Sequence, residues 1–350
     1  MESSVIRRSA VAGLAVLIGA GLATAPQNTK AMDFTGKTIK IVIPYGPGGT
    51  YDKYGVAFTN HLGKHIPGNP NLILQHMPGA GGAKAMNWTY NVMPKNGLNM
   101  IVPLDNSVLN QLMRPEKMRY KAEEFTWLGS SNQTNVVMVA RTDSGVTKLK
   151  DLETKSLIVA TSGKASTGYM IPGLLNGLFG YKIKIVQGYK GSSGSILAIE
   201  QGEAQASAYN WLAWSSKVPH WFTKEKPFGG PIAQIGVFKD PALPDSVPMI
   251  SDLVTDEMDK KAVDFIKVLG LLGRGLALPP GVDKEVVATL RTAYSKMNAD
   301  PAFAADLKKQ GLRLIPASGE KINSVVAEAM QNASPDVVAH ARKLIYGAGS

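Results

Sequence analysis

The chain has 350 residues, of which 44% are hydrophobic, and this length predicts about two lobes rather than a single hydrophobic core. It contains no cysteine, which excludes disulfides, thiol nucleophiles and iron–sulfur or cysteine–zinc sites. The formal net charge is +11, but lysine and arginine are scattered without the basic runs of a nucleic-acid-binding surface. The charge therefore indicates either solubility alone or a small anionic partner.

The amino terminus, residues 1–31, predicts a signal peptide for export. Arg7 and Arg8 precede an uncharged apolar stretch, and Ala23 and Ala25 offer alternative cleavage points. The apolar stretch is shorter than the roughly 20 residues that a membrane-spanning helix needs. An uncleaved membrane anchor is the alternative interpretation. We therefore expect an exported, periplasmic protein. The sequence does not decide between the alternative cleavage points.

Predicted strands and helices alternate in the first third of the chain. Apolar runs predict strands at residues 39–43, 72–74 and 99–102, and the segments between them predict helices at 51–65 and 83–92. This alternation is typical of parallel strands joined by right-handed crossovers.

Two glycine-rich loops, residues 44–52 and 78–82, join the first two strands to their helices. Each loop leaves unpaired backbone N–H groups at the positive end of a helix dipole, which favours an anion there. Two such positions indicate one anionic ligand held by the main chain. Glycines that only form turns with positive φ are the alternative interpretation.

After a linking stretch at residues 125–133, the same alternation restarts and predicts a second, smaller sheet. Helices are predicted to begin near Thr167 and Ser193. We expect an α/β fold of two lobes, each a mainly parallel sheet flanked by helices. The strands of the second sheet are predicted at residues 136–140, 157–160, 183–186 and 205–209.

Helix-capping residues punctuate the final third of the chain. Asp283, Asp300 and Ser334 each precede a predicted helix. The chain is predicted to return to the first lobe after it has formed the second. Two connections between the lobes place a cleft between them, and this geometry favours hinge closure. Lobe 1 is predicted at residues 32–135 plus 253–350, and lobe 2 at residues 136–252.

Arg274 is the lone cation of an apolar strand predicted at residues 271–278. It requires an anionic partner, because burying an unpaired charge is costly. A ligand carboxylate and a fixed acidic side chain are both candidates for that partner. Asn210, at the end of another predicted strand, faces either the cleft or the core.

Five motifs occur in a distinctive order between residues 38 and 346. They are Ile43-Pro44-Tyr45-Gly46-Pro47-Gly48-Gly49 with Asp52, Pro78-Gly79-Ala80-Gly81-Gly82, Ser162-Gly163 with Ser166-Thr167, Gly188-Tyr189-Lys190-Gly191-Ser192, and Pro279-Pro280-Gly281-Val282. This ordered set resembles the Bug family, the extracytoplasmic solute receptors of tripartite tricarboxylate transporters. The resemblance implies a Venus-flytrap fold, membrane permease subunits as partners, and a mono-, di- or tricarboxylate ligand. Independently of the resemblance, Tyr51, Tyr189, Trp211 and Trp214 are candidates to line a pocket for an aromatic acid.

The resemblance also implies which residues hold the ligand. In the family the two glycine loops seat one carboxylate, and hydroxyl groups of the second lobe complete the site. We expect Asp52 to order the first loop rather than touch an anion. Ser166 and Thr167 also fit a plain helix-capping role. With Asn210 and Arg274 added, the candidate ligand-binding residues are Gly48, Gly49, Thr50, Tyr51, Gly79, Ala80, Gly81, Gly82, Ser162, Ser166, Thr167, Gly191, Ser192, Asn210 and Arg274.

Sequence patterns of catalysis and of metal binding do not occur. His61 and His65 have helical spacing for a metal, but the glutamate of the metalloprotease pattern does not follow His61. The chain also lacks the nucleophile elbow of serine hydrolases. We expect a monomeric binding protein without cofactor or metal, not an enzyme. A ligand-sensing subunit of a signalling receptor is the alternative function, and an exported hydrolase is a more distant one.

Overall fold

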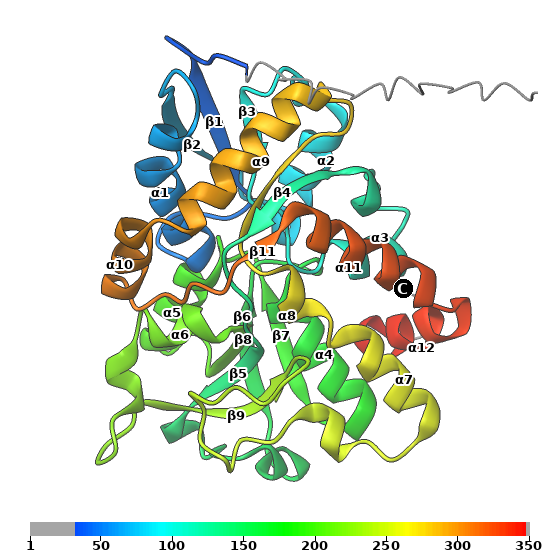
Figure 1. Ribbon diagram of the computed structural model, residues 1–350. Coiled ribbons are helices and arrows are strands. Elements are labelled where there is room, and N and C mark those ends of the chain that lie inside the picture. Colours follow the sequence, from blue (N-terminus) through cyan, green and yellow to red (C-terminus); the bar gives the residue numbers. More distant parts are fainter. Residues whose placement is uncertain (1–31, 348–350) are drawn as a thin grey trace, which may run out of the picture. The chain divides into compact units, whose positions relative to one another are not determined.

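The computed structural model describes residues 32–347, so the predicted signal peptide lies outside the described residues. The described residues form two β-sheets with helices packed on them (Figure 1). The strand order is β11-β4-β10-β3-β1-β2 in the first sheet and β7-β6-β8-β5-β9 in the second. The strands are β1 (Thr38–Ile43), β2 (Asn71–His76), β3 (Asn99–Ile101), β4 (Thr126–Ser130), β5 (Val136–Arg141), β6 (Leu157–Thr161), β7 (Ile183–Gln187), β8 (Ala206–Asn210), β9 (Gly229–Ile235), β10 (Gly275–Leu278) and β11 (Ala317–Ser318).

Helices follow most of the strands. Within residues 32–347, none of them combines the length and the apolar character needed to cross a membrane. The α-helices are α1 (Thr50–His61), α2 (Ala83–Asn91), α3 (Ser107–Met113), α4 (Thr167–Phe179), α5 (Ser192–Glu200), α6 (Trp211–Ser215), α7 (Glu257–Ile266), α8 (Leu269–Leu272), α9 (Lys284–Asn298), α10 (Pro301–Lys309), α11 (Gly319–Asn332) and α12 (Pro335–Tyr346).

The α/β fold predicted from the sequence is confirmed, but both sheets are mixed rather than mainly parallel. Strand β1 pairs in parallel with β2 and β3, and β6 pairs in parallel with β7 and β8. In contrast, β10 is antiparallel to β3 and β4, and β5 is antiparallel to β8 and β9. Strands β5 and β10 each adjoin a crossover between the sheets, where no βαβ unit imposes a parallel direction, and the short β11 is also antiparallel to its neighbour β4.

Three strands were not predicted from the sequence, and the returning strand is shorter than predicted. Strand β4 lies in the segment 125–133, which was expected to be a link, and neither β9 nor the two-residue β11 was expected. Gly129 in β4 and Pro231 in β9 explain the weak signal, because both residue types are depleted in strands. The returning strand begins only after α8, so Arg274 precedes β10 instead of lying within it.

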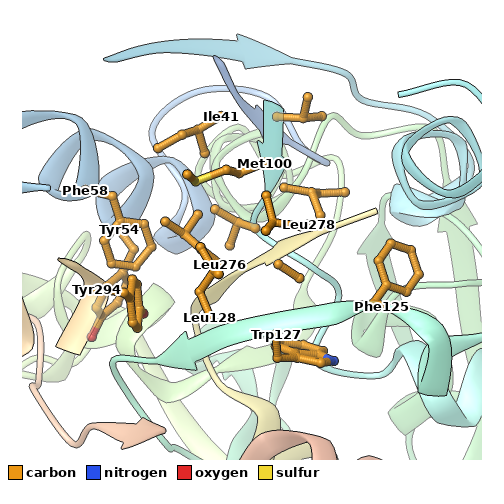
Figure 2. Close-up of a cluster of buried hydrophobic side chains, with 14 of the residues drawn as sticks. Ile41, Tyr54, Phe58, Met100, Phe125, Trp127, Leu128, Leu276, Leu278 and Tyr294 are labelled. Atoms are coloured by element: carbon orange, nitrogen blue, oxygen red, sulfur yellow. The ribbon is translucent and has the colours of Figure 1, made fainter. Parts of the chain in front are cut away.

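The core of the first sheet surrounds β10. All four residues of this strand are buried, and Leu276 and Leu278 belong to the cluster drawn in Figure 2. Ile41 of β1, Phe58 of α1 and Tyr294 of α9 belong to the same cluster. A strand covered on both faces carries apolar residues along its whole length, which explains the uninterrupted apolar sequence of β10.

The carboxyl-terminal helices divide between the two sheets. Phe303 of α10 and Val326 of α11 lie in the hydrophobic cluster of the first sheet. Val263 of α7 and Ile345 of α12 lie in a cluster with strands of the second sheet. The lobe boundaries predicted from the sequence stay a prediction, although α7 and α12, which lie in the range predicted for lobe 1, pack in the cluster of the second sheet.

Two crossover segments between the sheets lie against each other. The chain leaves the first sheet at residues 131–135 and returns to it through Gly273 and Arg274. The N–H of Ser131 donates to the Arg274 carbonyl oxygen at 2.8 Å, and the N–H of Arg274 donates to Oδ1 of Asn132 at 2.7 Å. Rotation of one sheet against the other would therefore bend this hydrogen-bonded pair of segments.

Gly273 is the tightest position of this crossover. Its φ of 58° and ψ of −140° suit glycine, and a Cβ there would overlap the carbonyl oxygen of Asn132. We predict that Gly273→Ala lowers the free energy of unfolding by about 3 kcal/mol or more through strain and overlap.

Gly180→Ala is the matched control for this prediction. Gly180 also has a positive φ, of 67°, but no atom lies near its Cβ position. The control should cost only about 1 kcal/mol. Chemical denaturation of both variants measures the difference, and equal losses would contradict the crowding argument.

Candidate functional site

A small cavity is lined by residues from elements of both sheets. Six of its lining residues were candidates from the sequence, namely Thr50, Tyr51, Thr167, Ser192, Asn210 and Arg274. Four lining residues were not predicted, namely Tyr45, Asp105, Tyr209 and Ala213.

Three helices begin at this cavity. Thr50, Thr167 and Ser192 are the first residues of α1, α4 and α5. These helices follow the carboxyl ends of β1, β6 and β7, each of which has a parallel neighbour, and this end of a strand is where α/β sheets bind ligands. The first N–H groups of a helix have no partner within it, and the macrodipole makes this end positive. The three helix starts therefore favour an anion in the cavity.

Arg274 is the cation of the cavity, and its side chain is only 3% exposed. Its Nη1 donates to Oδ2 of Asp105 at 2.6 Å and to the carbonyl oxygen of Gly273 at 3.1 Å. Its Cζ lies 3.7 Å from the centre of the Tyr51 ring, which is a cation–π contact. Burial by itself lowers the pKa of Arg274, but Tyr51 and Asp105 outweigh it and raise the pKa above its usual value. The fixed acidic partner left open by the sequence is thus Asp105.

The pairing with Asp105 leaves part of the guanidinium of Arg274 for a ligand. Among the described residues, Nε and Nη2 reach only the hydroxyl oxygen of Thr50, at 3.4 and 3.3 Å. These distances are longer than the about 2.9 Å of an ordinary N–H···O bond. The Nε–Nη2 edge is the edge that binds a carboxylate with two parallel hydrogen bonds. A fixed partner and a ligand carboxylate are therefore compatible.

Neutral tyrosines form much of the remaining lining. Burial raises the pKa of Tyr45, Tyr51 and Tyr209, so their hydroxyl groups stay protonated at neutral pH. The rings of Tyr45 and Tyr51 have centroids 4.9 Å apart. Tyr209 Oη lies 2.7 Å from the hydroxyl of Ser195. The tyrosines offer apolar ring surface and hydrogen bonds without adding charge.

Asp52 orders the first glycine loop, as expected from the sequence. Its Oδ2 accepts the N–H of Gly48 at 2.7 Å, and its Oδ1 lies 2.6 Å from Nε2 of His76. The N-cap of α1 is Gly49 rather than Asp52, which sits in the first turn of the helix. The N–H of Gly48 is thereby engaged within the loop, and neither Gly48 nor Gly49 lines the cavity.

The second glycine loop, residues 79–82, contacts the other sheet instead of lining the cavity. A Cβ at Gly81 would lie 2.8 Å from the backbone nitrogen of Ser166, just before α4. The carbonyl oxygen of Gly81 accepts the hydroxyl of Tyr45 at 2.8 Å, which links the two glycine loops. This loop therefore forms part of the seam between the two sheets.

Three further candidate positions, Ser162, Ser166 and Gly191, lie in loops of the second sheet and do not line the cavity. Ser166 is the N-cap of α4, but its hydroxyl donates to the Gly163 carbonyl at 2.8 Å within its own loop. Gly191 is the N-cap of α5, and its φ of 124° directs the chain into that helix. These residues shape the helix starts around the cavity.

The free space inside the cavity is about 20 Å³. This volume has room for about one water molecule. A carboxylate ligand needs more space, so the sheets must separate, or the tyrosines move, for a ligand to enter. In this arrangement the cavity is consequently too small for a carboxylate ligand.

The histidines of the predicted metal spacing have separate partners. His61 Nε2 lies 3.0 Å from Asp306, and His65 Nε2 lies 3.1 Å from Asp300. His65 also lies beyond the end of α1. No group of three or more metal-binding side chains occurs within the part of the chain that the structure describes.

Comparison with known proteins gives the fold a context. No family model matches the sequence. The protein is 24% identical over 334 residues to the UPF0065 protein in the gbd 5′ region of Cupriavidus necator, a match that covers 91% of this chain and 93% of that protein. The periplasmic binding protein BugD superposes with a TM-score of 0.69 at 15% identity, over 85% of this chain and 95% of BugD. The chain has the fold of BugD.

A second solved structure of the same fold contains a bound carboxylate. MatC of Rhodopseudomonas palustris, solved with malate, superposes on this chain with a TM-score of 0.69 at 20% identity. The match covers 87% of this chain and 100% of MatC. The two matches cover 95% of BugD and 100% of MatC. The resemblance to the Bug family drawn from the sequence is confirmed at the level of the fold.

We predict that Arg274 and Asp105 are strongly coupled in stability. Arg274→Met leaves the Asp105 carboxylate buried without its partner and should lower the free energy of unfolding by about 3–5 kcal/mol. Asp105→Leu leaves the guanidinium of Arg274 buried without its charged partner and should lower the free energy of unfolding by a similar amount. The double variant should recover most of the loss. Chemical denaturation of the four proteins measures the coupling, and simple additivity of the two losses would contradict a buried pair.

Proposed function

We propose that the chain is an exported solute-binding protein that captures a small organic carboxylate between its two sheets and delivers it to a membrane permease of the tripartite tricarboxylate transporter type. The observation that carries this proposal is the convergence of three helix N-termini and Arg274 on one buried cavity. In this proposal residues 1–31 are the signal peptide for export to the periplasm.

The ligand carboxylate is bound by the Nε–Nη2 edge of Arg274 and by the first N–H groups of the helices that begin at Thr50, Thr167 and Ser192. The site acts by binding alone. Each donor is held by its own helix or crossover, so binding requires the sheets to close but no rearrangement of the individual donors. Tyr45, Tyr51 and Tyr209 exclude water around the bound group.

We expect the ligand to close the two sheets on each other, because the groups that bind it come from both sheets. Helix α1 belongs to the first sheet, whereas α4 and α5 belong to the second, so a ligand that contacts all of them favours the closed arrangement. Arg274 lies in the crossover itself and bonds to Ser131 and Asn132 of the facing segment. The ligand is thereby bound at the hinge, where small rotations separate the sheets.

The known proteins of this fold support a binding role. BugD is a periplasmic binding protein, and MatC was solved with malate, a carboxylate. We therefore infer a receptor rather than an enzyme, and the same positive helix starts explain why an anion is the ligand class.

Isothermal titration calorimetry with a panel of organic carboxylates tests the proposal. We predict that at least one carboxylate binds, and that Gly81→Asp weakens its binding by about tenfold or more because the new side chain meets the backbone of Ser166 and holds the sheets apart. Thermal unfolding should change only slightly, because separation of the sheets relieves the overlap and aspartate is one of the residues that tolerate a positive φ.

Gly188→Asp is the matched control, since Gly188 also has a positive φ, of 118°, but nothing lies near its Cβ position. It should leave the affinity unchanged. Failure of every mono-, di- and tricarboxylate to bind the purified wild-type protein would overturn the proposed function.

A further inference from the structure

Asp105 adds a negative charge to a cavity that is otherwise built for an anion. Arg274 and Asp105 are the two charged side chains among the described lining residues, so the lining carries no net side-chain charge. The side chain of Asp105 is only 7% exposed. A ligand in this cavity therefore meets one cation and one carboxylate, not a purely positive surface.

The position of Asp105 is fixed by its neighbours. Its N–H donates to the hydroxyl oxygen of Tyr51 at 3.1 Å, and its Oδ2 accepts Nη1 of Arg274 at 2.6 Å. The next residue, Asn106, donates its side-chain N–H to the carbonyl oxygen of Ala165, in the loop before α4, at 2.7 Å. The segment is thus held on both sides of the seam, and Asp105 cannot turn away from a ligand.

This arrangement discriminates ligands by charge. The first carboxylate of a ligand is compensated by the Nε–Nη2 edge of Arg274 and by the helix starts. A second carboxylate in so small a cavity lies close to Asp105, and like charges in a buried site repel strongly. An ammonium or hydroxyl group at the same end of the ligand donates a hydrogen bond to that carboxylate instead.

We propose that Asp105 selects the charge of the ligand: the protein binds a monocarboxylate that also carries an N–H or O–H donor, an amino acid or a hydroxy acid, in preference to the dicarboxylate of equal length. This inference rests on the proposed function and narrows it. The preference comes from the acidic lining residue and not from the helix starts, which attract any anion.

Calorimetry with matched ligands tests the inference. The probes are ω-amino, ω-hydroxy and α,ω-dicarboxylic acids of equal chain length, in a series of lengths and with aromatic spacers. The wild-type protein should bind the amino or hydroxy acid about tenfold or more tightly than the matched dicarboxylate. Asp105→Asn keeps the shape, removes the charge and should shift the preference toward the dicarboxylate by about tenfold or more. Comparison of the amino with the hydroxy acid identifies which donor the site takes.

Asp240→Asn is the matched control. Asp240 is also buried and also pairs with an arginine, through two bonds of 2.8 and 2.9 Å to Arg313, but it does not line the cavity. Its substitution should leave the ligand preference unchanged. Thermal unfolding checks that each variant folds. If Asp105→Asn does not fold, the ligand preference of the wild-type protein alone decides whether the charge selection holds.

The outcomes separate the two proposals. A wild-type protein that binds the dicarboxylate as tightly as the matched amino and hydroxy acids, or an Asp105→Asn variant that folds with unchanged preference, overturns the charge selection while leaving carboxylate binding intact. Failure of all of these acids, and of the tricarboxylates, to bind overturns the proposed function itself.

Discussion

The guanidinium of Arg274 is buried at the point where the chain returns from the second sheet to the first, and the site depends on how this charge is satisfied. An unpaired charge in this position would cost several kcal/mol. Asp105 supplies the compensating carboxylate from the segment after β3, Thr50 supplies a hydroxyl from the start of α1, and the ring of Tyr51 covers the guanidinium. One buried charge thereby joins the crossover to the start of α1 and to the segment after β3 around the same cavity.

The location of Arg274 also connects binding with movement. Its backbone bonds to Ser131 and Asn132 in the facing crossover, while its side chain faces the cavity. In the proposed function, a carboxylate at the free edge of the guanidinium contacts the crossover and the helix starts of both sheets together. The positive ends of α1, α4 and α5 supply an electrostatic attraction that depends on main-chain geometry and not on the titration of a side chain.

The sequence predicted the part of the site that has local signals. Glycine and serine after apolar runs marked the starts of α1, α4 and α5, and a lone arginine beside an apolar run required a partner. Asp105 was missed, although an acidic residue three positions after the strand predicted at residues 99–102 was a usable signal. The role of the loop at residues 79–82 was not predictable, because the same glycine pattern serves either an anion or a close contact with Ser166. Strand β4 was missed because its pairing with β10 and β11 outweighs the weak strand propensity of Gly129.

A crystal structure of the protein with a tightly bound carboxylate tests the central claim most directly. The account predicts that the carboxylate oxygens lie within hydrogen-bonding distance of Nε and Nη2 of Arg274 and of the first N–H groups of α1, with Asp105 still paired to Nη1. A ligand carboxylate bound only by the loop at residues 79–82, with Arg274 unchanged and out of reach, would contradict it.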